Sequence, residues 1–154
     1  MKTEQMIGSF FRDILDHLDE NGKKDLEEII RQKNSALVEN FIEEHDVTHF
    51  LRDAKGNTML HLFMGSIFPK NIQPLIEKGL DVNAINFNGD TPLHFGCMTF
   101  CISNLKVLIS HGANIHAENK YGETGLHIAA RYGRKDLIEF LIKQGVDLLS
   151  LIHI

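Results

Sequence analysis

The chain has few of the features that mark secreted, membrane-bound and disulfide-rich proteins. Its 154 residues include only two cysteines, Cys97 and Cys101, and no N-x-S/T sequon. The sequence shows neither a signal-peptide pattern nor an apolar run of membrane-spanning length. Two cysteines cannot build a disulfide framework. We therefore expect a reducing compartment, the cytoplasm or the nucleus, and no association with a membrane.

Motifs of catalysis are also missing. The chain has no G-x-x-x-x-G-K-[ST] phosphate loop, no G-x-S-x-G nucleophile elbow and no convincing pair of carboxylates. Nine histidines leave a metal-dependent enzyme as an alternative. The spacing of His45 and His49 resembles a zinc-binding helix, but the repeat described below should end a helix at His45. We expect no enzymatic activity, no metal and no cofactor.

The net charge is negative and unevenly distributed. Residues 1–52 hold 7 basic and 12 acidic side chains and so carry the whole formal charge of −5. The remainder of the chain is balanced. A negative protein does not favour binding to nucleic acid or to an anionic membrane surface. A basic partner surface near the N-terminal end is one interpretation, and a solvated acidic end that keeps the protein soluble is the favoured one.

Residues 86–118 contain one complete structural unit. Thr91 can cap the N-terminus of a helix, and Pro92 follows at the first helical position, where its missing N–H costs nothing. A second helix is indicated by apolar residues at three- and four-residue spacing, and Gly112 supplies its left-handed end. Asn88-Gly89 predicts a tight turn before the threonine.

The same unit recurs with a period of 33 residues, which is visible in three sets of positions. The threonines, the histidines three residues later, and the closing glycines are Thr58, Thr91 and Thr124; His61, His94 and His127; and Gly79, Gly112 and Gly145. A 33-residue period with a T-P-L-H-like motif resembles the ankyrin repeat. The resemblance covers residues 19–149.

The resemblance implies an all-α ankyrin-repeat solenoid of about four helix-turn-helix units with short hairpin loops. Apolar residues at helical spacing predict an N-terminal amphipathic helix that caps the stack, because the end repeat of a solenoid otherwise exposes its core face. The expected boundaries are 1–18 for the capping helix, 19–52 for a degenerate repeat, 53–85, 86–118 and 119–149 for three further repeats, and 150–154 for the C-terminal tail.

Two recurring residue types have structural interpretations. In ankyrin-like repeats the histidine of the motif is expected to hydrogen-bond to the threonine and neighbouring backbone. Cys97 stands where these repeats place a small core alanine, so we expect a buried, unreactive thiol.

The resemblance also implies a protein-binding surface, because hairpin tips and the outer faces of first helices bind other proteins in this family. Phe87 and Tyr121 are prominent, since aromatic residues dominate interface energies and turn tips favour polar ones. Packing along neighbouring tips is the alternative role for these rings. The expected partner-binding residues are Lys55, Asn57, Phe87, Asn88, Asp90, Met98, Lys120, Tyr121, Glu123, Arg131 and Tyr132.

The sequence thus predicts a non-catalytic module that binds and masks another protein. In layout it resembles the short IκB-like ankyrin proteins of polydnaviruses, which would imply a Rel-type transcription factor as the partner. The alternative is a scaffold fragment of a longer ankyrin-repeat protein. The apolar end, Leu148 to Ile154, suggests a truncated or non-native terminus, or an extended segment packed on the fourth unit.

Overall fold

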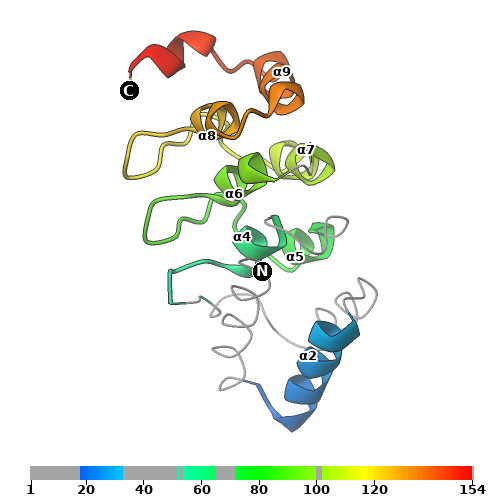
Figure 1. The fold of residues 1–154 in the computed structure, drawn as a ribbon. Coiled ribbons are helices and arrows are strands. Elements are labelled where there is room, and N and C mark those ends of the chain that lie inside the picture. The colour runs from blue at the N-terminus through cyan, green and yellow to red at the C-terminus, as the bar shows by residue number, and fades with distance from the viewer. Residues whose placement is uncertain (1–17, 33–51, 53, 65–71, 100–101, 154) are drawn as a thin grey trace.

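A computed structural model describes residues 18–32, 52, 54–64, 72–99 and 102–153 (Figure 1). These residues form helices and connecting turns, with no β-strand among them, which confirms the all-α prediction. The elements are α2 (Glu20–Gln32), α4 (Met59–Met64), α5 (Gln73–Glu77), α6 (Pro92–Met98), α7 (Ile102–Ser110), α8 (Gly125–Arg131), α9 (Lys135–Lys143) and the 3₁₀ helix η1 (Leu148–His153).

The first helices of three units begin at equivalent positions. Helices α4, α6 and α8 start at intervals of 33 residues, each directly after a threonine of the repeated motif. Thr91 and Thr124 are the N-cap residues, and both have the extended backbone that an N-cap adopts. The prediction that these threonines start equivalent helices is therefore confirmed.

Glycines stop the second helices as predicted. Gly79, Gly112 and Gly145 have φ values of 94°, 89° and 100°, in the left-handed region that other residues rarely adopt. Each follows the second helix of its unit, and its N–H donates to a carbonyl in the last turn. The chain then reverses toward the next hairpin.

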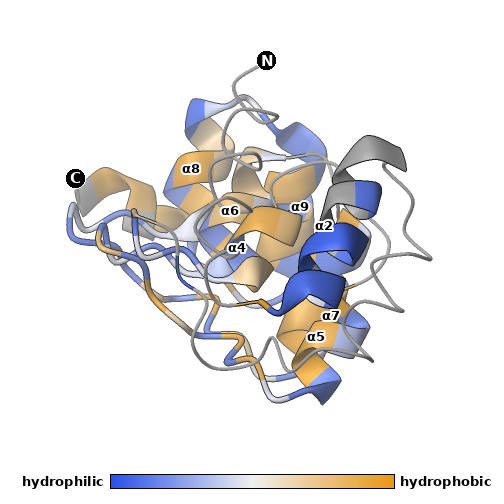
Figure 2. Cartoon of the chain, turned by 90° about the horizontal axis from the view of Figure 1, so that it is seen from below, coloured by the Kyte–Doolittle hydropathy of each residue, from blue (hydrophilic) through white to orange (hydrophobic). Residues whose placement is uncertain are grey.

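The units stack side by side. Helix α4 packs against α6, and α6 packs against α8, while the hairpin loops project from one edge of the stack (Figure 1). Seen along the stack, α4, α6 and α8 are predominantly hydrophobic, and α2 is predominantly hydrophilic (Figure 2). The core is continuous from repeat to repeat, because apolar residues of neighbouring units belong to one buried cluster.

Side-chain sizes are matched between neighbouring units. Gly96 occupies the helix position that Phe63 fills one repeat earlier, and a Cβ atom on Gly96 would lie 2.4 Å from the Cε of Met64. Gly125 is similarly close-packed, since an added Cβ would lie 2.6 Å from Leu93 Cδ2 and 2.9 Å from Cys97 Sγ. These glycines therefore make room for larger side chains from the preceding repeat.

Several sequence predictions lie outside the described residues. These are the capping helix of residues 1–18, apart from Leu18, the second half of the 19–52 unit, and the His45–His49 segment. Helix α2 occupies the place predicted for the first helix of the 19–52 unit. The prediction that residues 19–52 form a complete repeat remains a prediction.

The C-terminal segment differs from the extended conformation considered above. Residues Leu148–His153 form η1, a 3₁₀ helix that contacts α8. Leu151 packs partly against the core, whereas Leu148, Leu149 and Ile152 remain exposed. A 3₁₀ helix eclipses side chains three residues apart, so this segment does not bury all of its apolar residues on one repeat.

Candidate protein-binding surface

The repeated histidine joins each unit to the next. His94 is fully buried, and its Nδ1 accepts a hydrogen bond from the Thr91 N–H at 3.0 Å and lies 2.9 Å from the Thr91 hydroxyl. Its Nε2 lies 3.0 Å from the backbone carbonyl of Glu123 in the following hairpin. His61 bridges to the Asp90 carbonyl in the same way, at 2.8 Å. The structural role predicted for these histidines is confirmed.

These partners determine the protonation state of His94. A backbone N–H can only donate, so Nδ1 must accept, and a carbonyl can only accept, so Nε2 must carry the proton. Both requirements are met by the neutral ring alone. Burial lowers the pKa of His94 below its usual value, an effect that Asp90 and the backbone of Ala117 oppose. The junction between these two repeats therefore depends on a neutral imidazole.

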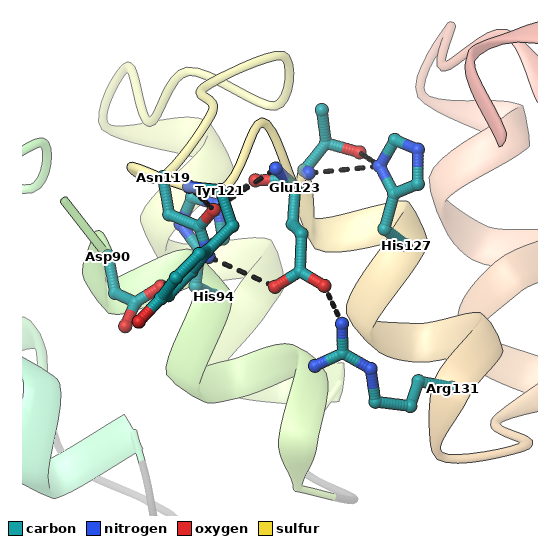
Figure 3. Close-up of polar contacts among 8 residues, drawn as sticks. Asp90, His94, Asn119, Tyr121, Glu123, His127 and Arg131 are labelled. Atoms are coloured by element: carbon teal, nitrogen blue, oxygen red, sulfur yellow. Dashed lines mark hydrogen bonds and ion pairs between the residues drawn. The ribbon is translucent and has the colours of Figure 1, made fainter. Parts of the chain in front are cut away.

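A buried asparagine shapes each of two hairpins. The Asn86 Oδ1 accepts from the N–H groups of Asn88 and Asp90, both at 2.9 Å. The Asn119 Oδ1 accepts from Tyr121 and Glu123, both at 3.0 Å (Figure 3). Each asparagine thus holds its loop closed from inside, without using the side chains at the tip.

Neighbouring hairpins are joined through the backbone. The Phe87 N–H donates to the Lys55 carbonyl at 3.0 Å, and the Lys120 N–H donates to the Asn88 carbonyl at 2.9 Å. These bonds recur with the repeat period, so the tips form a regular row. The spacing of the row is therefore set by main-chain atoms, which leaves the tip side chains available for other contacts.

A second series of bonds involves the residue before each threonine. Asn57 accepts from Asn86 Nδ2 at 2.8 Å, and Asp90 accepts from Asn119 Nδ2 at 3.0 Å. Glu123 accepts from Asn119 Nδ2 at 3.3 Å and forms an ion pair with Arg131 (Figure 3). The polar side chains at this position therefore face the stack.

Asn57 was expected on the partner-binding surface, and that expectation is wrong. Its side chain is 0% exposed and bonds to Asn86 of the next unit. Asp90, Met98 and Glu123 are half-buried. The remaining residues of the predicted surface are exposed, namely Lys55, Phe87, Asn88, Lys120, Tyr121, Arg131 and Tyr132.

The aromatic residues at the tips are the largest exposed groups of the hairpin row. Phe87 is 73% exposed, although one edge of its ring lies over Gly56, where an added Cβ would be 2.8 Å from Phe87 Cδ1. Tyr121 is 64% exposed, and the Lys120 ammonium lies 5.0 Å from its ring centroid. Each ring is held on one side and open on the other, as expected of a preorganised contact residue.

Other groups show no arrangement for chemistry in the part of the chain that the structure describes. Burial raises the pKa of Cys97 to about 12, which keeps its thiol protonated. No cluster of three or more histidine, cysteine or acidic side chains is placed to hold a metal among the described residues. No helix of the described ranges is long and apolar enough to cross a bilayer.

Asn86 and Asn119 shape the hairpin row but are absent from the sequence-based site. The signal was available, because they recur 33 residues apart and each precedes its threonine by five residues. Their side chains act on loops, where asparagine is expected for its turn-forming bonds. The periodicity therefore contained a second structural position beyond the threonine and the histidine.

Comparison with known proteins agrees with this architecture. A family model described as "Ankyrin repeats (3 copies)" matches residues 26–119 and, in a second overlapping placement, residues 69–151. Together these matches span most of the chain. No curated protein matches the sequence.

Proposed function

Because the chain belongs to the ankyrin-repeat family, we propose that it binds another protein through its hairpin tips and masks the surface it binds. Ankyrin repeats generally act as non-catalytic modules of protein–protein interaction. The observation that carries the proposal is the exposure of Phe87 and Tyr121 on a row of tips whose shape is fixed by other atoms.

The position of the charged residue Arg131 extends this surface to the end of helix α8. Arg131 and Tyr132 are both exposed, and Arg131 pairs with Glu123 of the adjoining hairpin. Ion pairing restricts the Arg131 side chain before a partner arrives, which lowers the entropy lost on binding. Tip and helix end therefore form one contiguous surface within the last described repeat.

We further propose IκB-like inhibition, with a Rel-type transcription factor as the masked partner, in the cytoplasm or the nucleus. This finer proposal rests on the similarity in layout to the IκB-like ankyrin proteins. Occupancy is the mechanism, since a bound solenoid covers whatever surface its partner uses for other contacts. It requires no reaction and no cofactor.

A scaffold role within a longer ankyrin array is the second candidate. The exposed Leu148, Leu149 and Ile152 on η1 favour it, because a further repeat stacked at this end would bury them. A longer open reading frame with additional repeats would support this candidate.

The test measures binding of a purified Rel homology region by isothermal titration calorimetry. Phe87→Ala and Tyr121→Ala should each weaken binding by about 2 kcal/mol or more, because exposed aromatic anchors lose their contact area. Ile142→Ala is the matched control, since Ile142 is an exposed apolar residue on the outer helix α9. Unfolding of both aromatic variants, or an equal loss for the control, would contradict the assignment of the surface.

A further inference from the structure

Basic and acidic side chains at the hairpin tips have different surroundings. Lys55 and Lys120 are exposed. Asp90 is half-buried and accepts a hydrogen bond from Asn119, whereas the Glu123 side chain is 14% exposed and is bonded to both Asn119 and Arg131. The carboxylates are thus turned inward and partly neutralised, while the ammonium groups face solvent.

This local pattern differs from the charge of the whole protein, which is −5. Arg52 adds a further exposed cation beside the row, where it donates to the carbonyls of Gly56 and Ile85. Glu118 is the exposed carboxylate next to the last tip, two residues before Lys120. A partner that contacts the tips themselves therefore meets mainly positive charge and aromatic rings.

The main-chain bonds of the row give its spacing. The Asn86 N–H donates across its own hairpin to Asp90, and the Phe87 N–H donates to the preceding hairpin at Lys55. Hydrogen-bonded backbone segments lie about 4.8 Å apart, so two segments per repeat place successive tips roughly 10 Å apart. Lys55 and Lys120 are two repeats apart, which corresponds to roughly 20 Å.

An extended chain covers that distance in about six residues, at about 3.3 Å per residue. Residues six apart in an extended chain lie on the same face, as do the residues two and four positions after the first. A single strand-like segment can therefore place one acidic side chain on each lysine. Its apolar side chains then fall on the same face between them, beside Phe87 and Tyr121.

We propose that the hairpin row binds an extended acidic segment of a partner protein, with carboxylates six residues apart and apolar residues between them. The inference rests on the proposed function and specifies the chemistry of its partner. Lys55 and Lys120 pair with the carboxylates, and Phe87 and Tyr121 cover the apolar side chains.

The test uses a synthetic peptide, Glu-Ser-Phe-Ser-Leu-Ser-Glu, with flanking glycines and blocked ends. Titration into isotopically labelled protein is followed by two-dimensional NMR at peptide concentrations up to several millimolar. We expect amide shifts concentrated at Lys55, Phe87, Lys120 and Tyr121. The affinity should exceed that for the matched peptide with lysine in place of glutamate by threefold or more.

Two controls test spacing and macromolecular class. Exchanging the last glutamate with the serine before it keeps the composition but moves that carboxylate to the opposite face, and should weaken binding. A thymidine oligonucleotide of twelve bases should bind less tightly than the acidic peptide. Equal binding of the lysine peptide, tighter binding of the oligonucleotide, or shifts away from the hairpin row would overturn the inference.

Charge variants provide a second measurement. Lys120→Gln should weaken binding of the acidic peptide about two- to fivefold, the range of an exposed ion pair, and Glu118→Gln should strengthen it. The opposite ranking would refute the charge assignment. Loss of Rel binding in the aromatic variants, but not in a Lys55→Gln/Lys120→Gln double variant, would overturn the inference and leave the proposed function standing.

Discussion

Replacing His94 with alanine tests the central junction of the stack. The side chain is completely buried and joins Thr91 of its own unit to the carbonyl of Glu123 in the next. Alanine can supply neither the acceptor at Nδ1 nor the donor at Nε2. The substitution therefore acts on the folded state at the contact between two repeats.

The expected cost follows from the groups left behind. The Thr91 N–H belongs to a residue that is 3% exposed, so losing its acceptor costs about 2 kcal/mol. The Glu123 carbonyl belongs to a half-buried residue that water can approach, so its loss costs about 1 kcal/mol. We expect a decrease of about 3 kcal/mol in the free energy of unfolding, a large fraction of the stability of a small protein.

Urea denaturation at pH 7.5, followed by far-ultraviolet circular dichroism, measures this change. His116→Ala is the matched control, because His116 is exposed, and its unfolding free energy should change by less than about 0.5 kcal/mol. A His94→Ala variant that unfolds at the wild-type urea concentration would refute the role assigned to the bridge. A loss of similar size in the control would refute it as well.

Three further predictions concern pH, packing and reactivity. Because the folded pKa of His94 is lowered, the unfolded chain takes up its proton first; stability should be complete above about pH 6.5 and fall below it, and His94→Ala should flatten this decline in urea titrations. Gly96→Ala should destabilise by about 1 kcal/mol, since overpacking of about 1–3 kcal/mol exceeds a helix-propensity gain near 1, and Met64→Leu should recover part of the thermal stability; an increase in melting temperature from Gly96→Ala alone would contradict this reasoning. In a Cys101→Ser background, Cys97 should react with a thiol reagent at pH 8 far more slowly in native than in denatured protein, and equal rates would disprove its burial.

Much of the repeat architecture could be predicted because its determinants are local. A threonine before a helix, a proline at its first position and a glycine after the second helix each act within a few residues. Their recurrence at 33-residue intervals then fixed the register of Thr58, Thr91 and Thr124. The structure confirms the helix starts at all three positions.

The inward orientation of the polar residue before each threonine could not be obtained in this way. Asn57 is held by Asn86, which lies 29 residues later, so its burial depends on how two hairpins align. Position in a loop suggested exposure, whereas the partner in the next unit determines the outcome. The conformation of the Leu148–His153 segment likewise depends on its contact with α8.

The main-chain bonds from Phe87 to Lys55 and from Lys120 to Asn88 are indifferent to the identity of the residues that form them. Substitution at these sites can therefore change what the protein recognises while its outline stays constant. Selection can alter one tip at a time, and a laboratory can transplant a recognition pattern by exchanging single loop residues. The row behaves as a frame with interchangeable letters.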